Sequence, residues 1–179
     1  MTLHMCAVYR SLTTLIAASV AVFLFALTLA PPATAGEVVA FSADVAAGTI
    51  IVRTNERRLY FVLSQGQALR YTVGVGRVGR QWTGTSFIDA MYIRPNWRPP
   101  SEIKRDKPNL PDLIVGGSSA NPMGAAAMTL SGGPYAIHGT NRPNSIGGFV
   151  SYGCIRMYNE DITDLYDRVR VGTPVIVTP

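Results

Sequence analysis

Short runs of β-branched and apolar residues alternate with turn-forming residues along most of the chain, a pattern typical of β-strands. The run Thr49–Arg53 is largely β-branched, and Asn55 and Glu56 mark a turn before the next apolar run. Consecutive hairpins are the simplest arrangement of such runs. The sequence predicts a mainly β domain. The pattern is strand-like from Glu37 to Val75, including Thr49–Arg53, Arg58–Leu63 and Ala68–Val75, and further strands are expected at Ser86–Ile93, Ala125–Leu130, Pro134–His138 and Val175–Val177.

One segment near the C-terminus has the hydrophobic period of a helix instead of a strand. We expect Asn159 to cap its N-terminus, because a short amide side chain can bond the free backbone N–H groups there. Gly172 and Pro174 should end it. The apolar residues at helical spacing are Ile162, Leu165, Tyr166 and Val169.

The middle of the chain cannot be regular structure, because Arg94–Pro100 contains three prolines. Residues 101–122 are polar and interrupted by proline, so we expect a long loop with one short helical turn near Glu102–Asp106. Long loops in compact domains usually have a function. Trp97 either walls a substrate groove or covers the edge of the core.

The N-terminal residues have the composition of an export signal. Leu12–Ala30 is an uninterrupted run of apolar and small residues, and Ala33 and Ala35 fit the small-residue rule for signal-peptidase cleavage. We expect residues 1–35 to be a cleaved signal peptide and 36–179 to be one domain with its core at about 48–179. The alternative is an uncleaved anchor, because the apolar run is about long enough to span a bilayer.

After such cleavage His138 and Cys154 would be the only histidine and the only cysteine of the chain. Imidazole is the side chain whose pKa suits removal of a thiol proton near neutral pH. Gly139 and Gly153 lie beside them and permit close approach of a ligand to the backbone. This pattern favours a nucleophilic cysteine with a histidine base, the alternative being a small buried thiol and a structural histidine.

Two other kinds of site are disfavoured. The glycines of Val75–Arg80 are not followed by a predicted helix, which a nucleotide phosphate site would need. One cysteine and one histidine cannot supply the three or four ligands of a usual zinc site. We therefore expect neither a cofactor nor a bound metal.

The segment around these residues resembles the catalytic domain of the L,D-transpeptidases, bacterial enzymes that crosslink the cell wall. That family has a histidine followed by glycine or serine, a spacer, and then Ser/Thr-His-Gly-Cys, a hydrophobic residue, and Arg or Asn. Here the match is His138-Gly139 followed by Ser151–Arg156. Tyr152 stands where the family usually has a second histidine. The resemblance extends from about Ile50 to the C-terminus and implies a mixed β-sheet fold, sandwich-like or barrel-like, with one marked helix after the nucleophile.

The resemblance also implies a role for each matching residue. Cys154 would be the nucleophile, His138 the proton donor and acceptor, and the Gly139 carbonyl would orient the imidazole. Backbone N–H groups from Tyr152 to Cys154 would hold the oxyanion, and Arg156 would bind a carboxylate of the substrate or, alternatively, pair with helix acids. The residues expected to bind substrate are Ser151, Tyr152, Gly153, Arg156 and Trp97.

In that family the enzyme releases D-Ala from a peptidoglycan tetrapeptide stem and transfers the acyl group to an amine. The acceptor could be another stem, a D-amino acid or an amine of an outer-membrane protein. With water as acceptor the same residues would give an L,D-carboxypeptidase or a cysteine peptidase. A non-catalytic wall-binding module, inactivated by Tyr152, is a further alternative, although binding alone needs neither a thiol nor its base.

The charge of the chain agrees with such a partner without identifying it. Sixteen Lys and Arg outnumber eleven Asp and Glu, for a net charge of +5. A basic protein suits a polyanionic partner such as carboxylate-bearing wall peptides or a membrane surface. No nucleic-acid motif is present, so we expect an exported, periplasmic or wall-associated protein with no nucleic acid partner and no membrane attachment after cleavage.

Overall fold

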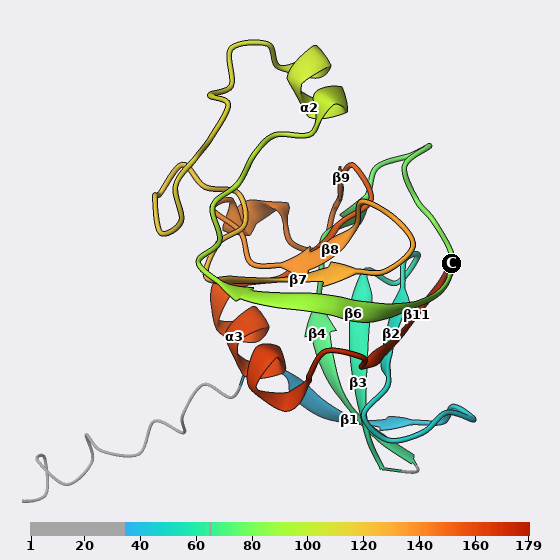
Figure 1. Cartoon of the computed structure of the whole chain (residues 1–179). Helices are drawn as coiled ribbons and strands as arrows, with labels where there is room; N and C mark the ends of the chain where they lie inside the picture. Colours follow the sequence, from blue (N-terminus) through green and yellow to red (C-terminus); the bar gives the residue numbers. More distant parts are fainter. Residues whose placement is uncertain (1–34, 65) are drawn as a thin grey trace, which may run out of the picture. The chain divides into compact units, whose positions relative to one another are not determined.

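The computed structural model describes residues 35–64 and 66–179, so the expected signal peptide lies outside the described residues except for Ala35, and Cys6 lies outside them too. Within the described ranges the chain is mainly β, with a mixed, open sheet whose strand order is β1-β4-β3-β2-β11-β6-β7-β8-β10 (Figure 1). The predicted mixed β fold is confirmed, and no closed barrel forms among these residues. The strands are β1 Glu37–Phe41, β2 Ile50–Arg53, β3 Arg58–Ser64, β4 Gly66–Thr72, β5 Val75–Gly76, β6 Gly84–Ile93, β7 Ala126–Leu130, β8 Ala136–His138, β9 Phe149–Ser151, β10 Ile155–Arg156 and β11 Pro174–Thr178.

The predicted hairpins form one half of the sheet. Strands β2, β3 and β4 pair antiparallel in sequence order, and the turn between β2 and β3 includes Asn55 and Glu56 as expected. Alternate side chains of these strands enter the main core, where Ile50, Val52 and Leu59 are completely buried. The two-residue period of the sequence thus becomes a buried face and a more exposed face.

Strand β6 joins the two halves of the sheet. Its first residues, from Gly84 to Phe87, pair with β11, and those from Ile88 onward pair with β7. Figure 1 shows this long strand crossing the molecule beside β7. Beyond β6 the sheet continues through β7 and β8 to β10. His138 lies at the end of β8, and Cys154 directly precedes β10.

The helix α3, Asn159–Arg168, begins and ends close to the predicted limits. Ile162 and Leu165 are completely buried, as the helical period indicated. The predicted capping role of Asn159 is wrong: the N-cap position is Tyr158 and carries no side-chain cap. The Asn159 amide instead accepts hydrogen bonds from the N–H groups of Ala125 and Thr140, at 3.0 and 3.1 Å, and donates one to the Thr140 carbonyl.

Three short elements were not predicted from the sequence: β9, β10 and the 3₁₀ turn η1, Pro143–Ser145. Each has only two or three residues, too few for a hydrophobic period to be visible. Strand β9 pairs with β5, and β10 pairs with β8, both in parallel. Their existence depends on partners that lie far away in the sequence.

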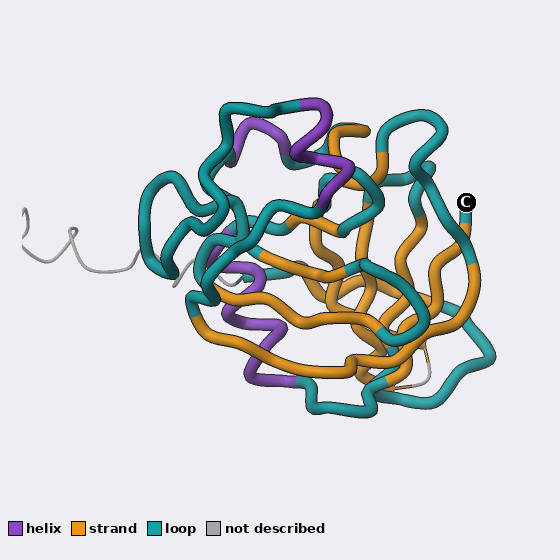
Figure 2. The backbone as a smooth tube through the Cα atoms, turned by 45° about the horizontal axis from the view of Figure 1, so that its top comes forward, coloured by secondary structure: helices purple, strands orange, loops and turns teal. Residues whose placement is uncertain are grey.

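The long loop expected between β6 and β7 carries one short helix, α2, Ser101–Asp106, at the predicted place. Figure 2 shows α2 and the rest of this loop lying outside the body of the sheet. No residue of α2 is buried. The base of the loop is ordered by a bridge between Trp97 and Ile114 and by the buried Asn121, whose amide donates to the carbonyls of Pro95, Ile114 and Val115.

Replacing Asn159 with alanine should destabilise the protein, because its amide makes three hydrogen bonds that join α3 to the loops around it. At about 1 kcal/mol for each bond, the free energy of unfolding should fall by roughly 2–3 kcal/mol. Chemical denaturation measures this change. The control is Asn141→Ala, which removes a single exposed bond to the Ser119 carbonyl and should cost less than about 1 kcal/mol. Equal losses of stability in the two variants would contradict the role of Asn159 in joining α3 to the loops around it.

Candidate active site

The parallel pairing of β8 and β10 joins the two halves of the expected site. Ile155 lies opposite Ile137, and Arg156 lies opposite His138. Both isoleucines point into the core, where neither is more than 1% exposed. Because side chains alternate along a strand, the neighbours of the isoleucines face the other side of the sheet.

Cys154 directly precedes β10 and therefore lies beside Ala136, on the same side as His138 and Arg156. The Ala136 backbone lies close enough to influence the pKa of the Cys154 thiol, and the charge of Arg156 influences the pKa of both Cys154 and His138. The structure thus brings the cysteine, the histidine and the arginine of the sequence motif together on two neighbouring strands.

His138 is held in one orientation and one tautomer. Its ring is only 2% exposed, and its Nδ1 atom lies 2.6 Å from the Gly139 carbonyl oxygen. A carbonyl can only accept, so Nδ1 carries the proton and Nε2 has a free lone pair. Burial, reinforced by the charge of Arg156, lowers the pKa of His138 to about 4, although the carbonyls of Gly139 and Pro122 oppose the shift. The imidazole is therefore neutral near pH 7.

Cys154 is unpaired among the described residues and is half-buried. Burial raises the pKa of its thiol, and the Ala136 backbone and the Arg156 charge offset part of that rise. The resting pair is consequently a neutral thiol with a neutral imidazole, not a thiolate with an imidazolium. Such a pair requires the imidazole to take the proton as the sulfur attacks.

Arg156 has an unused donor at this site. Its Nε atom is buried and has no hydrogen-bond partner among the described residues. It forms no ion pair with the acids of α3 in the described ranges, where the Arg168 guanidinium pairs with Asp164 instead. A buried donor without a partner is costly, and a carboxylate ligand would satisfy it.

Polar groups of the turn before Cys154 form hydrogen bonds with one another. Ser151 is 1% exposed; its hydroxyl donates to the Cys154 carbonyl at 2.6 Å and accepts from the Gly153 N–H at 3.0 Å. Ser151 therefore shapes the turn from inside and does not face the groove. The Gly153 N–H is likewise engaged, which leaves the Cys154 N–H as the donor nearest the nucleophile for an oxyanion.

Two aromatic residues that the sequence did not single out fix the position of Gly153. The Trp82 indole N–H donates to the Gly153 carbonyl at 2.9 Å, and Trp82 stacks on Tyr135 with ring centroids 4.6 Å apart. Gly153 has φ +120°, and a Cβ there would lie 2.4 Å from the Tyr135 ring, so only glycine fits. Since the C=O and N–H of one peptide point in opposite directions, holding the Gly153 carbonyl also aims the Cys154 N–H.

A groove of about 110 Å³ opens at the residues that flank Cys154, although neither Cys154 nor His138 lines it. Trp97, Tyr152 and Arg156 all line it, together with apolar residues of the long loop such as Ile103 and Leu110. Trp97 thus walls a groove, as one of its two interpretations required. The Tyr152 hydroxyl does not point into free solvent but donates to the Asp106 carboxylate of α2.

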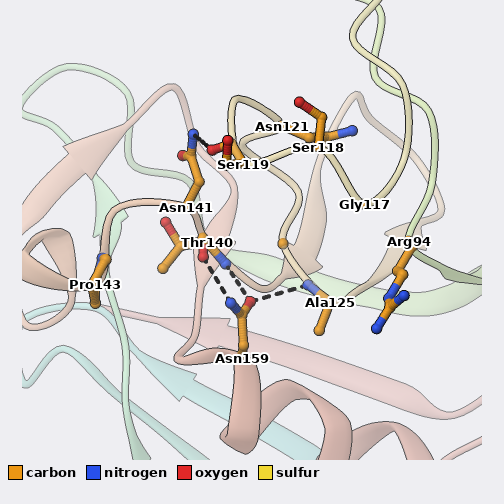
Figure 3. A pocket seen from close by; sticks show the side chains of 11 residues that line it. Arg94, Gly117, Ser118, Ser119, Asn121, Ala125, Thr140, Asn141, Pro143 and Asn159 are labelled. Atoms are coloured by element: carbon orange, nitrogen blue, oxygen red, sulfur yellow. Dashed lines mark hydrogen bonds between the residues drawn. The ribbon is translucent and has the colours of Figure 1, made fainter.

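A second, larger cavity of about 500 Å³ opens on the other side of Asn141, which lines both spaces. Figure 3 shows its floor, where the amide of Asn159 bonds the backbone of Thr140 and Ala125, and Arg94 lies at its edge. Gly124 and Gly139 are needed near this floor, because a Cβ on either would lie 2.2 or 2.4 Å from the Asn159 oxygen.

Within the described ranges no group of three His, Cys, Asp or Glu side chains could hold a metal ion. None of the helices described is long and apolar enough to cross a membrane.

Comparison with known proteins identifies the family. The profile of the YkuD family, the L,D-transpeptidase catalytic domain, matches residues 47–177. The chain therefore belongs to the L,D-transpeptidase catalytic domain family, as the sequence motif indicated.

Relatives in sequence include the Probable L,D-transpeptidase ErfK/SrfK of Escherichia coli, 37% identical over 135 residues, which are 70% of this chain and 42% of that protein. The Probable L,D-transpeptidase YbiS of the same species is 35% identical over 135 residues, 70% of this chain and 43% of the relative. The chain thus covers less than half the length of these relatives.

Solved structures share the fold. An L,D-transpeptidase from Mycobacterium smegmatis superposes with a TM-score of 0.55 at 19% identity, covering 73% of this chain and 58% of that one. L,D-transpeptidase 3 from Mycobacterium tuberculosis gives 0.58 at 14% identity, covering 73% and 60%. At such identities the likeness concerns the fold.

The low pKa of His138 should make the protein less stable in acid. Below pH 6.5 the histidine of the unfolded chain takes up a proton, whereas the buried imidazole remains neutral down to a pH of about 4. The neutral state of His138 therefore makes its full contribution to the free energy of unfolding above pH 6.5. As the pH falls to about 4, that contribution decreases by roughly 3 kcal/mol.

The measurement is the free energy of unfolding of the wild type minus that of His138→Asn, from denaturant titrations at pH 7, 5.5 and 4. Asp161 acts in the opposite sense, because burial raises its pKa to about 6, but it cancels in the difference. A difference that does not change with pH would disprove the buried neutral state.

Proposed function

We propose that this chain is a cysteine acyltransferase of the bacterial cell wall, an L,D-transpeptidase that forms a thioester with a peptidoglycan stem. The single observation that carries the proposal is the parallel pairing of β8 and β10, with a buried, neutral imidazole fixed by the Gly139 carbonyl on one strand and a free thiol just before the other. A structural role would explain a buried histidine and a buried thiol separately but not their common face beside a groove.

In the proposed first step, Nε2 of His138 removes the thiol proton while the sulfur of Cys154 attacks the carbonyl of the third stem residue. The tetrahedral oxyanion collapses to a thioester, and the amine of the terminal D-Ala leaves with the proton that His138 carries. An acceptor amine then attacks the thioester, His138 takes its proton and returns it to the departing sulfur. The cycle restores the neutral pair with which it began.

The surrounding residues have positioning and binding roles in this scheme. The Cys154 N–H would donate to the oxyanion, and Trp82 keeps that peptide in place through the Gly153 carbonyl. Arg156 would bind a carboxylate of the stem, which would give its buried Nε a partner. Gly139 orients the base through its carbonyl. Tyr152 need not be a base, because His138 already fills that role.

The relatives support this reaction class. The two Escherichia coli relatives are named as L,D-transpeptidases, and L,D-transpeptidase 3 from Mycobacterium tuberculosis has a structure with a faropenem-derived adduct. For this chain we propose wall peptide stems as donor and, as acceptor, a second stem, a D-amino acid or an amine of an outer-membrane protein. We also propose export by a signal peptide at residues 1–35, with 36–179 as the catalytic domain in the periplasm.

Incubating purified protein with muropeptides that carry tetrapeptide stems tests the proposal directly. We expect loss of D-Ala together with a crosslinked dimer, or with an exchange product when a D-amino acid is added, and no product from Cys154→Ser, read by mass spectrometry. A trimmed tripeptide alone would mean that water is the acceptor. If the stems stay intact and a carbapenem leaves Cys154 unmodified, the chain is a binding module and the proposal fails.

Trp82→Phe should slow the acylation step, because the ring still stacks on Tyr135 but no longer donates to the Gly153 carbonyl. We expect kcat to fall about tenfold, a fraction of what loss of an oxyanion donor usually costs, with KM changed less than about twofold. Steady-state kinetics with a tetrapeptide substrate measure both. Tyr135→Phe, which keeps the stacked ring, is the control. A rise in KM alone would place Trp82 in binding instead.

A further inference from the structure

The loop that covers the groove is attached to the site mainly by polar side chains. We call residues 95–122 the lid; they include α2, and Trp97, Ile103 of α2, Leu110 and Ile114 line the groove. Because α2 has no buried residue, hydrophobic burial does little to hold it in place. Figure 1 shows α2 standing clear of the sheet, on the side where β8 and β9 lie.

Asp106, at the end of α2, makes two contacts across the groove. It accepts a hydrogen bond from the Tyr152 hydroxyl and pairs with the Arg77 guanidinium at 3.1 Å. The Arg77 guanidinium also lies over the Tyr152 ring, 4.1 Å from its centroid. The hydrogen bond from Tyr152, and then that from Arg77, lower the pKa of Asp106, so the carboxylate is ionised when it accepts both.

A second pair joins the other end of α2 to the same neighbouring loop. Glu102, in the first turn of α2, pairs with Arg80. Arg77 and Arg80 both belong to the loop between β5 and β6, which also supplies Trp82 to the turn before Cys154. The lid is therefore tied to the loop whose Trp82 bonds Gly153, the residue before Cys154.

With these contacts made, the groove is small. Its volume is about 110 Å³, whereas pockets that enclose drug-sized ligands are about 300–1,000 Å³. Movement of the lid would give a stem of four residues more room. Tyr152 is the residue of the nucleophile turn that bonds the lid, and it stands where the family usually has histidine.

We propose that Tyr152 is a lid-positioning residue: with Arg77 it holds Asp106 and keeps the lid closed over Cys154 until a substrate displaces it. The proposal rests on the proposed function only in naming a peptide stem as the displacing group. The contacts are exposed, so each is individually weak, and together they make a closed state that a ligand can open. The hydroxyl thus controls access to the thiol and leaves its reactivity unchanged.

The test compares the rates at which a small and a bulky reagent alkylate Cys154, since access affects the bulky one more. Iodoacetamide and a maleimide carrying a polyethylene glycol chain serve as the two probes, and intact mass gives both rates. Tyr152→Phe and Asp106→Asn should each raise the ratio of bulky to small labelling by about threefold to tenfold. The labelling ratio of the double variant should be close to that of the single variants, because both substitutions break the same contact.

Tyr60→Phe is the matched control, because it removes a similar bond from a tyrosine hydroxyl to the Glu56 carboxylate far from the lid, and it should leave the ratio unchanged. Hydrogen exchange of residues 101–118 is a second readout and should quicken in the Tyr152 and Asp106 variants only. Unchanged ratios and exchange, equal acceleration of both reagents, or additive effects in the double variant would overturn the proposal. None of these readouts needs transpeptidase activity, so a failure of the lid proposal can be told apart from a failure of the proposed function.

Discussion

The parallel pairing of β8 with β10 is the constraint on which the rest of the site depends. Ile137 and Ile155 face each other in the core and are almost completely buried, so a shift of either strand by one residue would expose an isoleucine and bury a polar neighbour. The same register places His138 opposite Arg156 and Cys154 beside Ala136. Hydrophobic burial on one face of the sheet thereby fixes the chemistry on the other, and a two-residue strand is sufficient because its neighbours are rigid.

Burial also sets the protonation states of the reactive pair. It lowers the pKa of His138 and raises that of Cys154, and the positive charge of Arg156 favours the neutral imidazole while it partly offsets the effect on the thiol. A thiol beside a neutral base is less reactive at rest than a thiolate, which suits an enzyme whose sulfur is unpaired. The buried Arg156 Nε is the feature that a ligand carboxylate would complete. The same three side chains therefore set the acid–base properties of the pair and, in the proposed function, bind the substrate.

The segments around the site are held in two different ways. The floor depends on the half-buried amide of Asn159, which satisfies backbone groups of Ala125 and Thr140 that would otherwise lack partners. The lid, by contrast, is held through exposed charged pairs and one tyrosine hydroxyl. Buried bonds are costly to break and exposed pairs are not, so the floor stays rigid while the lid can open. Rigid support for His138 together with a movable cover would suit the acyl transfer proposed for this chain.

The sequence by itself determined the class of fold, most strands, α3, the short α2 and the family, because these depend on hydrophobic period, turn residues and a motif within one continuous segment. His138 and Cys154 could be singled out because no other imidazole or thiol lies beyond the expected signal peptide. The tertiary structure alone decided what Asn159 bonds, that Ser151 points inward, that Trp82 supports Gly153 and that Tyr152 reaches Asp106. Except for the local bond of Ser151, these contacts form between segments that the fold brings together, where no local period or propensity indicates the partner. Strands as short as β9 and β10 follow the same rule, since they exist only because a neighbouring strand offers its backbone.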